Sequence, residues 1–104
     1  MDERTFLVAL DAADPRVDSM VIQERIRSEP KFTAWWNHIP YVFLLTTPLT
    51  EAQVSKRLKP LTQGARFLVV EINPEHSEGW LPERAWRWIR RRSNDPAETN
   101  VAAE

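Results

Sequence analysis

The sequence contains no cysteine and only two glycines among its 104 residues. Without cysteine the chain can form neither a disulfide nor a thiolate metal site, and we expect a cytoplasmic protein. Two glycines are too few for the glycine-rich loops that cradle phosphate groups. The apolar runs are far shorter than the roughly 20 residues of a membrane-spanning helix. The acidic start Met-Asp-Glu-Arg lacks the apolar segment of a signal peptide, so we expect no membrane partner.

Neither sign of charge dominates, because 14 basic residues stand against 15 acidic ones and the net charge is −1. This balance argues against nucleic-acid binding over the whole surface, although a local basic patch is compatible with it. Hydrophobic residues make up 42% and charged residues 28%, which is typical of a globular domain. We predict a single domain over residues 1–92 and a flexible polar tail over residues 93–104.

Apolar runs separated by turn residues predict seven elements in the order strand, helix, strand, strand, helix, strand, helix. The expected strands cover residues 4–11, 32–39, 41–47 and 65–72, and the expected helices cover residues 15–27, 50–60 and 81–92. This order predicts the α+β class and, more narrowly, a ferredoxin-like βαββαβ sandwich with an extra C-terminal helix. If residues 32–39 are helical or irregular, the alternative is a three-stranded α/β sheet.

Short residue patterns predict where the helices begin. Asp14 and Pro15 are the residue types favoured at an N-cap and at the first helical position. Thr50 has Gln three residues after it, which is the spacing of a capping box. In the C-terminal helix, Glu83 and Arg87 are spaced for an ion pair one turn apart.

The strand that ends on Asp11 resembles a strand of the small CRISPR-associated adaptation protein and of its relatives, which include the VapD-type toxin ribonucleases. The strand and capped helix at residues 41–52 resemble the same group. Over residues 4–90 the chain is more similar still to small bacterial proteins labelled SinR-like, most of them uncharacterised. These share the aromatic hairpin, a strand like residues 67–72 and a tryptophan-containing helix like residues 80–89.

The resemblance implies a ferredoxin-like homodimer in which the Asp11 side chains of both subunits lie near the dimer axis. In the nuclease members, the two carboxylates are proposed to hold a divalent metal. A carboxylate from each subunit is a ligand set that suits Mg²⁺ or Mn²⁺. The alternative for Asp11 is an Asx-type turn before the first helix. The chain differs from the CRISPR protein because it lacks a basic surface and has a helix in place of a swapped C-terminal strand.

The C-terminal helix carries the basic concentration of this sequence. Arg84, Arg87 and Arg91 share one helical face, and with Trp86 and Trp88 interleaved they could bind the phosphates of RNA or DNA and stack a base. The alternative is a solvated helix face.

The only histidines are His38 and His76. Neither has an aspartate partner close in sequence, so we expect surface or structural roles rather than general-base catalysis.

These patterns favour a small homodimeric ferredoxin-like binding or assembly module. The second hypothesis is a divalent-metal-dependent endoribonuclease that uses Asp11 from both subunits. The third is a ligand-binding or regulatory domain, because a fold of this kind hosts many functions.

Overall fold

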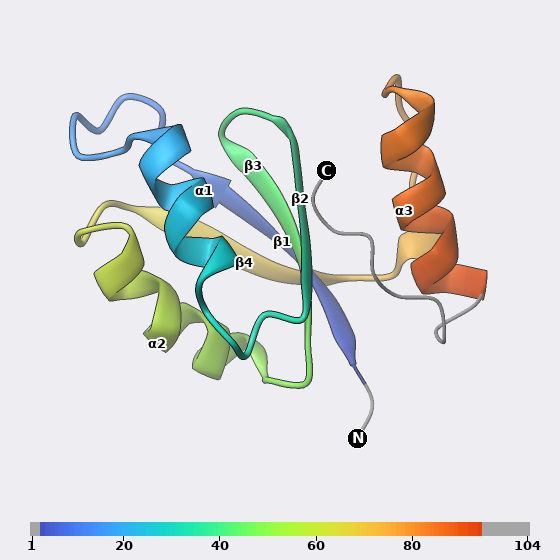
Figure 1. Ribbon diagram of the computed structural model, residues 1–104, viewed down its shortest axis with the longest axis horizontal. Helices are drawn as coiled ribbons and strands as arrows, with labels where there is room; N and C mark the ends of the chain where they lie inside the picture. The colour runs from blue at the N-terminus through green and yellow to red at the C-terminus, as the bar shows by residue number, and fades with distance from the viewer. Residues whose placement is uncertain (1–2, 95–104) are drawn as a thin grey trace.

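The computed structural model describes the backbone of residues 3–94 and the side chains of residues 3–91. It has four strands in one antiparallel sheet and three α-helices (Figure 1). The elements are β1 (Arg4–Leu10), α1 (Ser19–Arg27), β2 (Ala34–Ile39), β3 (Val42–Thr47), α2 (Glu51–Leu61), β4 (Phe67–Ile72), the short 3-10 helix η1 (Pro74–His76) and α3 (Glu83–Asn94). The α+β class is confirmed. No helix in this described part of the chain is long and apolar enough to cross a membrane.

The strand order is β2-β3-β1-β4, and every neighbouring pair is antiparallel. The apolar run of β1 is central, because Val8 faces Phe43 of β3 on one side and Val69 of β4 on the other. Residues 34–39 form the edge strand β2, so four strands rather than three make up the sheet. The β2–β3 hairpin is held by the Asn37 amide, which donates to the carbonyl oxygens of Ile39 and Val42, each at 2.9 Å.

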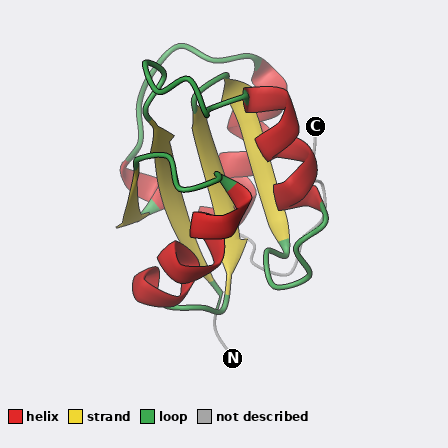
Figure 2. Cartoon of the chain, turned by 90° about the vertical axis from the view of Figure 1, so that its left-hand side faces the viewer, coloured by secondary structure: helices red, strands yellow, loops and turns green. Residues whose placement is uncertain are grey.

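Successive side chains on the strands point to opposite faces of the sheet, and each face carries its own apolar core. One core lies under α1 and α2. It contains Phe6, Val8, Ile22, Ile26, Phe43, Leu45, Val54 and Leu58. The smaller core lies under α3. It contains Ala34, Trp36, Leu44, Ala85, Trp88 and Ile89. Figure 1 shows α1 and α2 together on one side of the sheet and α3 on the other, and Figure 2 looks onto the α1–α2 side.

The predicted capping box at the start of α2 is confirmed. The Thr50 hydroxyl accepts a bond from the Gln53 N–H at 3.3 Å, and the Gln53 side chain accepts the Thr50 N–H at 2.9 Å. Two backbone donors that the helix itself leaves unpaired are satisfied in this way.

The predicted start of α1 at Asp14 and Pro15 is wrong. The helix begins at Ser19, and its cap is Asp18, whose carboxylate accepts the N–H groups of Met20 and Val21 at 3.1 and 3.3 Å. Asp14 instead bonds Arg16, accepting its backbone N–H at 2.9 Å and its side chain at 2.8 and 3.0 Å. The Asp14 carboxylate therefore closes a turn, and Asp18 is the N-cap of α1.

The other boundaries shift by a few residues. β4 begins at Phe67 instead of residue 65, because Ala65 is taken up in a turn that bonds its N–H to the Thr62 carbonyl at 3.1 Å. α3 begins at Glu83 and continues to Asn94, two residues beyond the predicted domain end. The rest of the predicted tail, residues 95–104, lies outside the described residues.

One buried and one exposed apolar side chain test the importance of the α1–α2 core. Leu45 of β3 is fully buried, whereas Met20 of α1 is 74% exposed. We expect Leu45→Ala to lower the free energy of unfolding by about 2–5 kcal/mol, because it removes apolar contacts and leaves a cavity. The control Met20→Ala should change the free energy of unfolding by less than about 1 kcal/mol. Urea denaturation measures both, and equal losses in the two variants would contradict this packing.

The Asp14–Arg16 pair generates a pH prediction. The Arg16 side chain and backbone lower the pKa of Asp14 from 3.8 to about 2. A carboxyl whose pKa falls on folding stabilises the native state above its unfolded pKa, and this contribution is lost as the pH falls toward the folded value. Asp14→Asn should therefore lower the free energy of unfolding at neutral pH. The difference in this free energy between the variant and wild type should become smaller below about pH 4.

NMR titration of the Asp14 carboxyl checks the cause directly. Arg16→Gln should move the pKa of Asp14 back toward 3.8, because the hydrogen bonds from the Arg16 guanidinium provide the largest part of the shift. An Asp14 carboxyl that titrates at the same pH in wild type and in Arg16→Gln would refute the assignment.

Candidate anion-binding cleft

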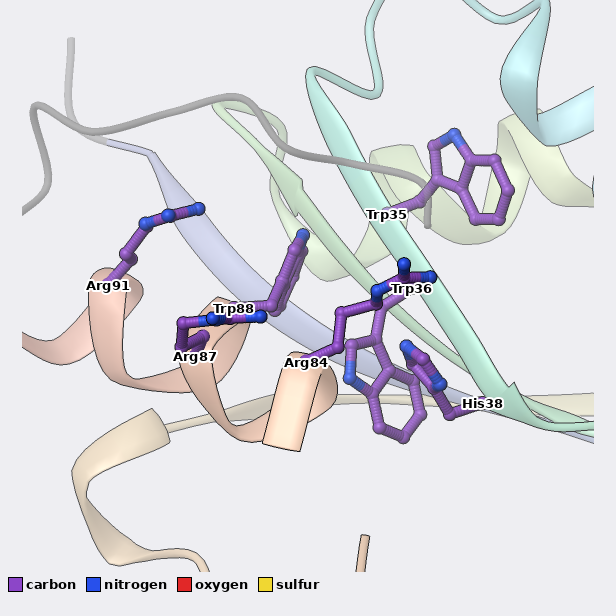
Figure 3. Close-up of a pocket in the computed structure, with 7 residues that line it drawn as sticks. All are labelled: Trp35, Trp36, His38, Arg84, Arg87, Trp88 and Arg91. Atoms are coloured by element: carbon purple, nitrogen blue, oxygen red, sulfur yellow. The ribbon is translucent and has the colours of Figure 1, made fainter. Parts of the chain in front are cut away.

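A cleft of about 340 Å³ lies between the edge strand β2 and α3. Its lining residues are Trp35, Trp36, His38, Arg84, Arg87, Trp88 and Arg91 (Figure 3). Figure 3 shows the Trp35 side chain pointing away from the other six. It packs in the core under α1 and α2, where the Arg27 guanidinium lies 5.3 Å from its ring centre. The functional side chains of the cleft are therefore those of β2 and α3 on the other face of the sheet.

Two periodicities bring these side chains together. On β2, the alternation of a strand places Trp36 and His38 on the same face. On α3, Arg84, Arg87 and Arg91 are spaced three and four residues apart, so they lie on one side of the helix. This side borders the buried stripe of Ala85, Trp88 and Ile89.

The floor of the cleft is aromatic and buried. Trp36 and Trp88 are each 4% exposed, and His38 is half-buried with its ring 5.2 Å from that of Trp36 in an edge-on contact at 65°. The Nε1–H of Trp36 is buried and has no hydrogen-bond acceptor among the described residues. A buried donor without an acceptor costs free energy, and an oxygen that enters between β2 and α3 would relieve that cost.

The walls of the cleft are cationic. Three of its lining residues are arginines, and among the described residues that line it there is no carboxylate. The predicted Glu83–Arg87 pair is not formed, because Glu83 bonds Arg90, two turns further along the helix, at 2.6 Å. Planar guanidinium groups bind phosphate and carboxylate through two parallel hydrogen bonds, so the cleft is suited to an anion.

The predicted basic residues Arg84, Arg87 and Arg91 thus share one site, and His38 joins them from β2. The predicted stacking of a base on Trp88 has little room, because this ring is buried in the smaller core. Trp86 is partly buried against the same core and does not line the cleft. The sequence pattern of β2 contained the signal for His38 and Trp36, since residues two apart on a strand share a face. Only the packing of α3 beside β2 shows that this face completes the arginine cleft.

Asp11 lies at the end of β1, separated from β2 by β3. One carboxylate oxygen accepts the Ala13 N–H at 3.0 Å, which is the Asx-type turn that was the alternative for this residue. The other oxygen lies 3.5 Å from the Arg66 guanidinium, and the Asp11 side chain is 31% exposed. Residues 3–91 contain no group of three His, Asp or Glu side chains that could hold a metal ion. A metal site at Asp11 therefore depends on a second subunit, and it stays a prediction.

The cleft and Asp11 are distinct places in the described part of the chain. The cleft offers cationic donors for binding, while Asp11 offers one carboxylate already engaged in a turn and an ion pair. Comparison of the chain with protein-family models, with curated proteins and with solved structures found no match.

Proposed function

We propose that the protein is a small, homodimeric, ferredoxin-like binding module whose β2–α3 cleft holds the phosphates of single-stranded RNA. The observation that carries this proposal is the convergence of Arg84, Arg87 and Arg91 on one concave site whose described lining contains no acidic residue.

The strand order supports the ferredoxin-like assignment. A βαββαβ chain of this family has an antiparallel sheet in which the first strand lies between the third and the fourth, with both connecting helices on one face. The order β2-β3-β1-β4 and the common side of α1 and α2 agree with that description. The sequence resemblance to the CRISPR-associated, VapD-type and SinR-like group points the same way. α3 is the addition, and it supplies the cationic wall of the cleft.

The dimensions of the cleft favour a single strand over a duplex. Arg84 and Arg91 are seven residues apart, which places them roughly 10 Å apart along the helix axis. This row matches a backbone of successive phosphates better than one isolated anion. A space of about 340 Å³ holds a nucleotide-sized group, not a double helix. Because the tryptophan rings of the floor are buried, we expect backbone charge rather than base stacking to dominate, and binding to depend little on sequence.

An exposed apolar strip on β4 supports the proposed homodimer. Leu68 is 60% exposed and Val70 is 43% exposed, and within the described sheet β4 is an edge strand. An unpaired edge with apolar side chains is a surface that a second chain can cover. The second copy of this protein is the occupant that the family resemblance suggests.

RNA binding is tested with a fluorescently labelled 12-nucleotide single strand. Arg87→Gln should weaken binding about ten-fold at low salt, because it removes a charge-assisted hydrogen bond worth roughly 1–2 kcal/mol. The dependence of log K on log salt should also become shallower by about 0.7 for each phosphate that the variant no longer neutralises. Fluorescence anisotropy across a salt series measures both quantities.

Lys56→Gln is the charge-matched control, since Lys56 is exposed on α2, which covers the opposite face of the sheet. It removes the same charge but should leave the affinity within about two-fold of wild type. Equal weakening by both substitutions would show that the net charge, rather than the cleft, binds RNA.

The second candidate is a divalent-metal-dependent endoribonuclease with Asp11 contributed by both subunits. The observation that favours it is the partial exposure of the Asp11 side chain at the end of the central strand. A divalent ion would have to compete with the Arg66 guanidinium for the same carboxylate oxygen. Mg²⁺ usually takes one or two protein carboxylates and keeps several waters, so a pair of Asp11 side chains would suffice as its protein ligands.

Cleavage assays separate the two candidates. If the protein is a binding module, wild type should leave single-stranded RNA intact in Mg²⁺ and in Mn²⁺, and Asp11→Ala should bind the RNA as wild type does. Asp14→Asn is the control for loss of a carboxylate in the same loop. Metal-dependent cleavage that is abolished in Asp11→Ala and retained in Asp14→Asn would replace the binding module with the nuclease.

A further inference from the structure

We propose that the acidic segment at residues 95–104 is an internal competitor for the arginine cleft. It would occupy the site that the proposed function assigns to RNA phosphates, so the inference rests on that function. The segment follows directly after α3, the helix that carries Arg84, Arg87 and Arg91. Its own structure lies outside the described residues, and its charge and its reach are what make it the occupant of the cleft.

The charges of the two parts are complementary. Residues 95–104 contain Asp95, Glu98 and Glu104 and no basic residue. The cleft presents three arginines and no carboxylate among its described lining residues. A carboxylate is a natural partner for a guanidinium fork, and it imitates the charge and geometry of a phosphate oxygen pair.

The segment is long enough to reach the cleft. From the end of α3 at Asn94 back to Arg84 is ten residues, which is roughly 15 Å along the helix axis. Ten residues of extended chain span up to about 33 Å. The length of the segment is therefore sufficient for its acidic residues to reach the arginines without any change in the helix.

Attachment to the same chain makes even a weak contact effective. A ligand that is joined to its site by a short stretch of chain has an effective concentration in the millimolar range. RNA must then displace the segment before it can contact the arginines, so the apparent affinity for RNA is reduced by the fraction of chains whose cleft is occupied. Salt weakens both contacts because each depends on exposed charges.

The test compares two variants of the 104-residue chain that have equal net charge. The first replaces the three acids of the segment: Asp95→Asn, Glu98→Gln and Glu104→Gln. The control replaces three acids outside the cleft: Glu71→Gln, Glu75→Gln and Glu78→Gln. Glu75 and Glu78 line a separate hollow on another side of α3, together with Trp86 and Arg90. Both variants lose three negative charges, so any difference between them reports position rather than net charge.

Affinity for the 12-nucleotide RNA should rise about three- to ten-fold in the segment variant, and by less than about two-fold in the control. The gain should shrink in about 0.5 M salt. Without RNA, the guanidinium Nε–H signals of Arg84, Arg87 and Arg91 should shift in NMR spectra of the segment variant and stay in place in the control.

Two results would overturn the inference. One is RNA affinity that is equal in the two variants, and the other is arginine signals that do not respond to the segment. If no variant binds RNA, the proposed function fails instead, and the arginine signals alone decide whether the segment occupies the cleft.

Discussion

The pairing of β1 along both of its edges is the constraint on which the remaining structure depends. β1 bonds β3 on one side and β4 on the other, and without it β4 would have no strand to pair with in the described sheet. Because its side chains alternate, the same strand supplies Phe6 and Val8 to one core and Leu7 to the other. The cleft depends on this arrangement, since α3 can rest beside β2 only on a face that β1 and β3 have already made apolar.

Much of the fold could be predicted from local patterns. The continuous apolar run of β1 predicts a central strand, and the Thr50–Gln53 spacing predicts the α2 cap, because each signal is contained in a few neighbouring residues. The start of α1 could not be predicted equally well, since Asp14 and Asp18 are both good caps. The choice depends on Arg16, whose side chain engages the first carboxylate. Residue propensities cannot show which of two nearby aspartates is engaged by another side chain.

One wall of the candidate site could be predicted from the sequence, and the other could not. Helical spacing alone groups the three arginines of α3, so that wall of the cleft could be found in the sequence. The other wall could not, because His38 and Trp36 are nearly fifty residues away along the chain and meet α3 only through tertiary packing. The same packing buries Trp88, which a sequence pattern alone offers equally well as a stacking platform. Asp11 shows the reverse case, in which the modest local alternative, an Asx-type turn, is what the chain forms.

Because α3 packs on its own small core, its local stability is set separately from that of α1 and α2. α1 and α2 share the larger core, whereas α3 is held by a separate cluster built around Ala85, Trp88 and Ile89. A helix with its own small core can open as a local unit while the sheet stays folded. A ligand that bridges β2 and α3 binds only the closed form, so its affinity includes the free energy of docking this helix. A ligand in the cleft therefore also holds α3 against the sheet. Binding of the ligand and docking of the helix are then coupled in a single equilibrium.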